Sequence, residues 1–298
     1  MIIQSCSYLT PKQLQALSAL LDECKRVDHN IVPAYLHLLD KPRSISCNIL
    51  CNDEQGNMIG FLRPFFFHET MCEMTVMVSP KHRRQGIARR MLGMALPYLK
   101  GMANLSFSVI ADVDQTWLEP YYMHQTSRQY TMQYLVSEPA SEPAFSHTLL
   151  PMRLATTKDL APLCALHHHC FPEPGHPLDN YFSSLLTDPQ YSIYVLEKNN
   201  RIIGKVHLRW QENSVFLADL AVTTREQRQG LGTQLIMHSI QMASKQHKQA
   251  LLLDVEEKNQ QALALYQRLG FVISNTHDYW KTNLPSPYFG LQTFLHAT

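Results

Sequence analysis

Glycine is the residue that this sequence lacks most clearly. Only 11 of its 298 residues are glycine, roughly half of the ~7 % that is usual in proteins. A chain so sparing with glycine is expected to keep it where the backbone conformation needs it. The positions of the few glycines are therefore informative.

Other absences narrow the class of protein. Lys and Arg total 26 against 25 Asp and Glu, which argues against a general binder of nucleic acid or of anionic membranes. The seven cysteines include no Cys-x-x-Cys pair, no apolar run approaches 18 residues, and the start has no signal-peptide pattern. We expect a cytoplasmic type of protein with two domains, since 298 residues exceed a typical single domain.

The glycines expose an internal repeat. Gly86 lies in SPKHRRQGIARRML and Gly230 in TTREQRQGLGTQLI, 144 residues later. The same interval separates Gly60 from Gly204, Val78 from Val222, Gln85 from Gln229 and Tyr122 from Tyr266. The stretch 137–146 is rich in Pro, Ser, Glu and Ala and reads as a linker. The chain is therefore expected to hold two related domains, at 1–140 and 146–298.

Each half is predicted to have a mixed α/β (α+β) fold. In the second half, a strand and two helices lead into three strands, expected at 191–198, 201–210 and 214–222. A helix follows, then a continuous apolar run (ALLLDVEE) that indicates a buried strand, then a helix ended by Gly270. The segments 271–275 and 288–295 are expected to close the sheet. The first half repeats this order up to its second helix.

The repeated glycine segment has the form [QR]-x-x-G-x-[GA] and follows a strand in each half. It reads Gln-Arg-Gln-Gly-Leu-Gly at 227–232 and Arg-Arg-Gln-Gly-Ile-Ala at 83–88. A helix that begins at such a turn offers unpaired N–H groups to a phosphate. The alternative is a purely structural role, in which these glycines only start a tightly packed helix. Neither a P-loop nor a complete dinucleotide fingerprint is present.

With these residues, both halves resemble the GCN5-related N-acetyltransferase (GNAT) superfamily. LADLAV, QRQGLG and LLLDVEEKNQQALALYQRLGF are similar to its RimI-like branch, and the tandem layout resembles mycothiol synthase and VipF-type bacterial effectors. The resemblance implies a largely antiparallel sheet that splays between its fourth and fifth strands, with acetyl-CoA in the split. In the second half the implied cofactor-binding residues are Leu220, Ala221, Val222, Gln227, Arg228, Gln229, Gly230, Leu231, Gly232, Thr233 and Asn259. In the first half they are Val76, Met77, Val78, Arg83, Arg84, Gln85, Gly86, Ile87, Ala88 and Arg89.

The resemblance also implies catalytic residues in the second half. A backbone N–H at Leu220–Val222 would polarise the thioester, and Tyr266 would protonate the leaving thiolate. Tyr266 has an alternative interpretation as an aromatic ring that braces Phe271. Asp254 stands where the RimI-like branch carries its base, while Asp219 could serve instead if its face lines the cleft.

The first half departs from the catalytic pattern. The 144-residue offset maps Asn259 to Gln115 and Asp254 to Ile110, so we expect it to bind acetyl-CoA or CoA with little or no catalysis. Glu73 is either a base on its fourth strand or an exposed residue. In the second half, CALHHHC (164–170) favours packing beside the acceptor groove over a metal site. Aromatic residues at 279–280 and 288–289 either shape a substrate pocket or belong to a core.

These expectations combine into one function and one competitor. The first is acetyl transfer from acetyl-CoA to a primary amine by direct attack in a ternary complex, catalysed by the second half. The amine could belong to a protein N-terminus, a lysine or a small molecule, with no nucleic-acid or membrane partner. The competitor is a tandem CoA sensor or scaffold without turnover, which would need neither Tyr266 nor an acid.

Overall fold

The computed structural model describes residues 1–68, 71–99, 104–110, 123–136, 150–171 and 178–282. The chain divides into two compact units. Unit 1 comprises residues 1–130, 256–258 and 275–298, and unit 2 comprises residues 131–255 and 259–274. The expected linker at 137–146, the strand at 288–295, and Gln115 and Tyr122 lie outside the described residues. Within the described ranges, no helix is long and apolar enough to cross a membrane.

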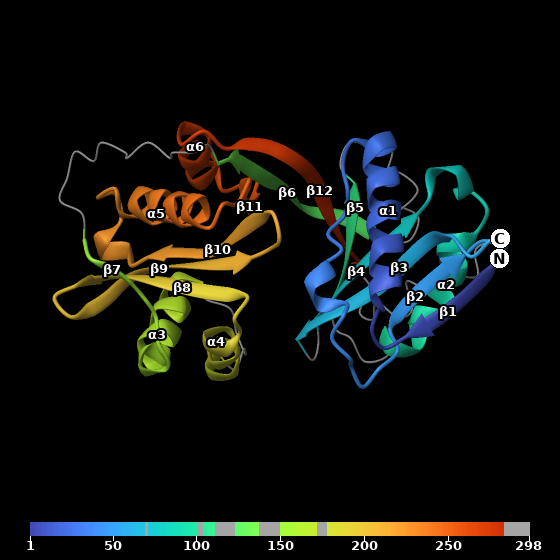
Figure 1. The fold of residues 1–298 in the computed structure, drawn as a ribbon, viewed down its shortest axis with the longest axis horizontal. Helices are drawn as coiled ribbons and strands as arrows, with labels where there is room; N and C mark the ends of the chain where they lie inside the picture. The colour runs from blue at the N-terminus through green and yellow to red at the C-terminus, as the bar shows by residue number, and fades with distance from the viewer. Residues whose placement is uncertain (69–70, 100–103, 111–122, 137–149, 172–177, 283–298) are drawn as a thin grey trace. The chain divides into compact units, whose positions relative to one another are not determined.

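Unit 1 is a mixed sheet with helices on its faces (Figure 1). Its elements are β1 (Ile2–Cys6), α1 (Pro11–Asp28), a 3₁₀ turn (Leu36–Leu38), β2 (Asn48–Asn52), β3 (Met58–His68), β4 (Met71–Val78), a 3₁₀ turn (Pro80–His82), α2 (Ile87–Ala95), a 3₁₀ turn (Leu96–Leu99) and β5 (Asn104–Ile110). The strand order is β1-β2-β3-β4-β5-β12. Only β4 and β5 among these pairs run parallel.

The last strand of unit 1 comes from the far end of the chain. β12 (Val272–Thr282) pairs antiparallel with β5 through residues 277–281. Trp280 of β12 is buried in a core cluster with Ile49, Met91 and Phe107. Of the aromatic residues predicted to line a pocket or a core, Trp280 therefore belongs to the core of unit 1. Residues 288–289 lie beyond the described residues.

Unit 2 repeats the arrangement. Its elements are β7 (Met152–Leu154), a 3₁₀ turn (Thr157–Asp159), α3 (Leu160–Cys170), α4 (Leu178–Thr187), β8 (Tyr191–Lys198), β9 (Arg201–Trp210), β10 (Ser214–Val222), a 3₁₀ turn (Thr224–Glu226), α5 (Leu231–Lys245), β11 (Ala250–Glu256) and α6 (Gln260–Arg268). The strand order is β6-β11-β10-β9-β8-β7, where β6 is Met123–Leu135. Figure 1 shows α5 on one side of this sheet and α3 and α4 on the other. The expected mixed, largely antiparallel sheet is confirmed.

Local sequence signals account for much of this framework. Asn199 and Asn200 both have positive φ (51° and 59°), as a tight β8–β9 hairpin requires. Gly270 has φ +91° after the end of α6, as predicted. A Cβ on Gly204 would lie 3.2 Å from the Ala221 carbonyl oxygen, so this glycine lets β9 pack closely against its neighbours.

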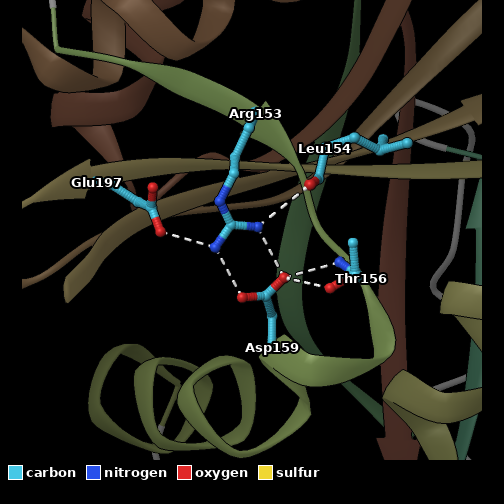
Figure 2. A network of polar contacts seen from close by, with 5 residues as sticks. All are labelled: Arg153, Leu154, Thr156, Asp159 and Glu197. Atoms are coloured by element: carbon cyan, nitrogen blue, oxygen red, sulfur yellow. Dashed lines mark hydrogen bonds and ion pairs between the residues drawn. The ribbon is translucent and has the colours of Figure 1, made fainter. Parts of the chain in front are cut away.

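The start of α3 is fixed by a polar network. Thr156 and Asp159 form a capping box on the 3₁₀ turn that leads directly into α3, whose N-cap is Asp159. Figure 2 shows Arg153 of β7 bridging two acids: its Nη1 and Nη2 each donate to Asp159 at 2.8 Å, and Nη2 also donates to Glu197 at 2.7 Å. The Arg153 guanidinium holds the pKa of Asp159 well below its usual range. α3 is thereby tied to β7 and β8 at its first turn.

Candidate functional site

The two glycine turns have matching backbone conformations. Arg84 and Arg228 have φ of 62° and 64°, and Gly86 and Gly230 have φ of 75° and 81°. Gly86 and Gly230 are the N-cap residues of α2 and α5. The carbonyls of these two glycines accept from the N–H four residues later at 3.0 Å in both units. The first N–H groups of a helix have no partner within that helix, so a turn of this kind suits an outside acceptor such as a phosphate.

Each turn is tied back to the preceding strand by the first residue of its motif. Gln227 Nε2 donates to the Val222 carbonyl at 2.9 Å, and Arg83 Nε donates to the Val78 carbonyl at 3.1 Å. Arg83 also forms a two-point ion pair with Asp28 at the end of α1, at 2.7 and 2.5 Å. Its guanidinium is therefore engaged within the protein in this structure.

Unit 2 has a pocket of about 570 Å³ beside its glycine turn. Nine of the predicted cofactor residues line it: Leu220, Val222, Gln227, Arg228, Gly230, Leu231, Gly232, Thr233 and Asn259. Sequence reasoning missed the wall formed by α6, where Gln261, Leu265 and Arg268 line the pocket at helical spacing. That spacing of three to four residues was the available signal.

The pocket opens where two parallel strands part. β10 and β11 pair only from Ser214–Ala250 to Leu217–Leu253, which leaves residues 218–222 beyond the last pair. The β9–β10 register also shifts between Ala218 and Ala221, and Asp219 there has φ +49°. This bulge turns β10 away from β11. The edge of β10 that faces the split has no ladder partner beyond Leu217 among the described strands.

The fourth strand of unit 1 is different. β4 and β5 stay paired to Thr75–Ser108, so only residues 76–78 extend beyond the last pair. The β3–β4 register is unbroken from Gly60–Val78 to Phe66–Cys72. The predicted residues Val76–Val78 therefore lie on a shorter, regular split. Of the remaining predicted residues, Gln85 donates to the Lys81 carbonyl at 3.4 Å, and Ile87–Arg89 form the first turn of α2.

Asp219 lies in a cluster of polar side chains on the face covered by α3 and α4. Its Oδ2 accepts from Tyr181 at 3.0 Å and lies 3.2 Å from His207 Nδ1, 3.6 Å from Lys205 Nζ and 3.9 Å from His167 Nδ1. We call these five residues the Asp219 cluster. Burial tends to raise the pKa of the Asp219 carboxyl, but His207, Lys205 and His167 lower it by more, so it lies below its ordinary value.

Asp254 has the opposite electrostatic setting. It lies on β11 one residue beyond the last pair with β10, and Thr131 Oγ1 donates to it at 2.7 Å. Although solvent reaches its side chain, the surrounding protein desolvates the carboxyl and raises its pKa, against smaller lowering effects from Thr131 and Arg209. Two carboxylates with oppositely shifted pKa values thus flank the split.

Tyr266 and Asn259 stand on α6. Tyr266 is buried, its ring centroid is 5.8 Å from that of Phe271, and desolvation raises its pKa to about 12. Tyr266 therefore belongs to the core and is not one of the described residues that line the pocket. Asn259 is the N-cap of α6, accepting from Ala262 N at 3.2 Å, and it also lines the pocket.

The remaining candidates are also located. Glu73 is 6 % exposed and accepts from the Tyr35 hydroxyl at 3.1 Å and from the Ser108 hydroxyl at 2.6 Å, so it is not an exposed strand residue. The CALHHHC segment does not gather its polar groups. Cys164 contacts Asp179 at 3.4 Å, whereas His167 belongs to the Asp219 cluster.

The acetyltransferase (GNAT) family matches the sequence twice, over residues 14–124 and 160–271. The chain belongs to the GNAT acetyltransferase family. Each match spans one copy of the glycine turn, so both copies of the repeat are GNAT domains.

Relatives share the tandem length. A mycothiol acetyltransferase of Streptomyces coelicolor is 25 % identical over 298 residues, which cover 94 % of this chain and 95 % of that protein. A GNAT structure from Sphaerobacter thermophilus has a TM-score of 0.76 at 14 % identity and 96 % coverage of both chains. A tandem GNAT protein from the clavulanic acid biosynthesis pathway has a TM-score of 0.68 at 13 % identity, covering 94 % of this chain and 98 % of its own. The two structures support the fold, and the family membership supports acetyl transfer in general.

Proposed function

We propose that unit 2 catalyses acetyl transfer from acetyl-CoA to a primary amine, by direct attack while both substrates are bound. The observation that carries this proposal is the split between β10 and β11, which lies beside the pocket at the glycine turn and has Asp219 on one strand and Asp254 on the other. Unit 1 retains the turn without the bulge, and we propose that it binds acetyl-CoA or CoA with little or no turnover.

The lining of the pocket fits the groups of acetyl-CoA. The first N–H groups of α5 and the Arg228 guanidinium suit a pyrophosphate. Asn259 and the apolar residues in the α6 wall, Ala262, Ala264 and Leu265, suit the pantetheine chain. N–H groups on the free edge of β10 near Leu220 suit the thioester oxygen. These assignments concern the predicted cofactor residues of unit 2.

The chemistry removes two protons from the acceptor nitrogen and delivers one to the leaving thiolate. The acceptor arrives as an ammonium ion and gives one proton to Asp254, whose raised pKa suits it as a base. The neutral nitrogen then attacks the carbonyl carbon, the C–N bond forms and the C–S bond breaks. The second N–H proton leaves to solvent, and the thiolate takes the phenolic proton of Tyr266, which solvent restores. A pKa of about 12 keeps that phenol protonated at neutral pH.

The acceptor is proposed to be an amine of a small molecule. The support is the full-length relative that is named as a mycothiol acetyltransferase. The RimI-like residues of unit 2 support a peptide N-terminus as the second choice. A cysteine nucleophile is not part of this scheme, because Cys164 and Cys170 lie on α3 and the pKa of each thiol is raised by burial.

Thiol release from acetyl-CoA tests the proposal. The full chain is assayed at pH 7–9 with glucosamine, a peptide with a free N-terminus, and an N-terminally blocked lysine peptide. We expect release with at least one amine, and a loss of about 10- to 100-fold in Tyr266→Phe and Asp254→Asn. CoA binding by calorimetry without thiol release for any amine would instead support a tandem sensor or scaffold.

A further inference from the structure

The Asp219 cluster contains more polar groups than an acetyl-CoA site requires. Lys205 and His207 lie two residues apart on β9, so they share one face of the sheet. Their contacts with His167 of α3 and Phe182 of α4 show that α3 and α4 cover this face. The exposed fractions of Lys205 and His207 are 0 % and 2 %. His167 comes from α3 and Tyr181 from α4. Three elements therefore converge on the one carboxylate of the β10 bulge.

The distances assign the hydrogens of the cluster. Lys205 Nζ lies 3.2 Å from His207 Nε2 and 3.4 Å from His167 Nδ1. An ammonium only donates, so both of these nitrogens accept. His207 then carries its hydrogen on Nδ1, 3.2 Å from Asp219 Oδ2. A neutral His207 fits its pKa, which burial lowers to about 3.

The cluster is costly to the fold. A fully buried ammonium loses its hydration, and the Lys205 ammonium recovers part of it from the rings of Phe182 and Phe171, whose centroids lie 5.2 and 5.6 Å away. Asp219 adopts a left-handed backbone at φ +49°, which a non-glycine residue rarely adopts. Two unfavourable features that converge on one carboxylate point to a role for that carboxylate.

Unit 1 shows that the fold does not need this cluster. The 144-residue offset puts Phe61 and Arg63 on β3 at the places of Lys205 and His207. The unbroken β3–β4 register leaves no bulge residue to match Asp219. The same sheet is therefore built with a phenyl ring and an arginine in those two positions.

The two oxygens of Asp219 differ in their contacts. The shortest contact with each of its four partners is to Oδ2, and Oδ1 accepts no hydrogen bond from the part of the chain that the structure describes. The side chain is 24 % exposed, and the next residue, Leu220, lines the pocket. Ala218 pairs with His207, so these two residues lie on one face of the sheet. Leu217 pairs with Leu253, and both lie on the opposite face. Asp254 follows Leu253, so strand alternation puts it on the same face as His207. Both carboxylates therefore border the split from one side.

We propose that Asp219 binds the acceptor as a primary ammonium ion through Oδ1, and that Lys205 and His207 are positioning residues that hold Oδ2, while His167 accepts from Lys205. This inference rests on the proposed function of unit 2 and names its substrate class. The acceptor is an aliphatic amine that is protonated at neutral pH, and aromatic amines are poor acceptors. Asp219 holds the ammonium, and Asp254 takes its proton.

A pair of probes of equal shape tests the binding step. Benzylammonium and benzyl alcohol are titrated calorimetrically into the full chain saturated with CoA at pH 7.5. We expect benzylammonium to bind at least about 10-fold more tightly, the worth of a charge-assisted hydrogen bond. Asp219→Asn should remove that preference while CoA binding stays within about twofold. Equal binding of the two probes to the wild type would overturn the proposal.

Three further variants separate positioning from folding. Lys205→Met/Asp219→Asn removes both charges together, so it should fold and still lack the ammonium preference. Lys205→Met alone should keep the preference at pH 7.5, but as the pH is lowered it should lose the preference at a higher pH than the wild type does. The reason is that the Lys205 ammonium helps to lower the pKa of Asp219, so without it the carboxylate is protonated at a higher pH. His207 and His167 still face Asp219 in this variant, and Tyr181 still donates to it. Asp179→Asn on α4, an equal loss of charge outside the cluster, should change neither quantity. An unshifted pH dependence in Lys205→Met would refute the positioning role.

The two proposals fail in different ways. If no amine releases thiol but benzylammonium still binds through Asp219, the transfer reaction is wrong and the ammonium site stands. If amines release thiol in Asp219→Asn with an unchanged KM for the amine, the ammonium site is wrong and the transfer reaction stands. In the supported case, Asp219→Asn raises the amine KM about 10- to 100-fold, leaves the acetyl-CoA KM within twofold, and aniline is a poorer acceptor than benzylamine.

Discussion

The two units share a fold and a glycine turn, but they differ in the geometry of their fourth strands. Their glycine turns have matching φ angles at the arginine (84 and 228) and at the glycine (86 and 230). In each turn, the side chain of the first motif residue donates to the carbonyl of the last residue of the preceding strand. Their fourth strands differ. β10 has a bulge and five residues beyond its last parallel pair, while β4 has a regular register from Cys72 to Val78 and three residues beyond its last parallel pair. A phosphate-type turn depends on backbone geometry alone, so it survives changes in side chains. A catalytic split depends on one extra residue in a strand, which is easily lost or gained.

The largest expected effect concerns the shared turn. Gly230→Val is expected to lower turnover by about 100-fold or more, because an L-residue at φ +81° is strained and a branched side chain obstructs the N–H groups of α5. The matched Gly86→Val in unit 1 is expected to change turnover by less than about threefold. Steady-state thiol release checks both. Equal losses in the two variants would mean that the units share the catalytic work.

The tyrosine gives a sharper version of the same comparison. Tyr266→Phe should lower kcat by about 10- to 100-fold, because the thiolate loses its proton donor while binding is kept. Tyr122→Phe, at the position 144 residues earlier, should leave kcat unchanged. Pre-steady-state thiol release distinguishes chemistry from product release. If Tyr266→Phe had wild-type kcat, the ring would only brace Phe271.

The parts of the site that were predictable are local in sequence. Gly86 and Gly230 stand in polar turns before amphipathic helices, so their positive φ and N-cap role could be inferred. Asn259 likewise precedes an amphipathic helix and is its N-cap. These features depend on the few residues around them.

The rest depends on contacts between distant segments. Lys205 stands in RIIGKVHLRW, where a lysine in a strand usually reads as a solvent-facing residue, and only α3 and α4 bury it. The bulge at Asp219 has no residue signature in SVFLADLAV, since no glycine marks it. The pairing of β12 with β5 joins residues about 170 apart in the chain, beyond the reach of any periodicity.

Acid stability compares one buried imidazole in each unit. Burial lowers the pKa of His207 in unit 2 to about 3 and that of His277 in unit 1 to about 4. Below pH 6.5 the unfolded chain binds a proton that the folded histidine does not, so stability falls as the pH drops toward the folded pKa. At pH 5 each histidine should cost about 2 kcal/mol relative to pH 7.5. Urea unfolding at both pH values checks this, and His207→Gln and His277→Gln should each remove part of the pH dependence.

The smallest effect tests whether the residue that opens the turn matters. Arg83→Gln gives unit 1 the glutamine that unit 2 has at Gln227, so the donor to the Val78 carbonyl is kept while the ion pair with Asp28 is lost. Arg83 is more than a third exposed and screened by solvent, whereas Asp28 is largely buried, so a loss of about 1 kcal/mol in unfolding free energy is expected. Urea unfolding measures it, with Lys81→Gln, which removes an exposed ion pair to Glu23, as the control with no measurable change. CoA binding to unit 1 should change by less than threefold, because the N–H groups of α2 are untouched. A larger loss of CoA affinity would mean that the guanidinium leaves Asp28 for the phosphate, and that the turn of unit 1 works through its side chain where the turn of unit 2 works through its backbone.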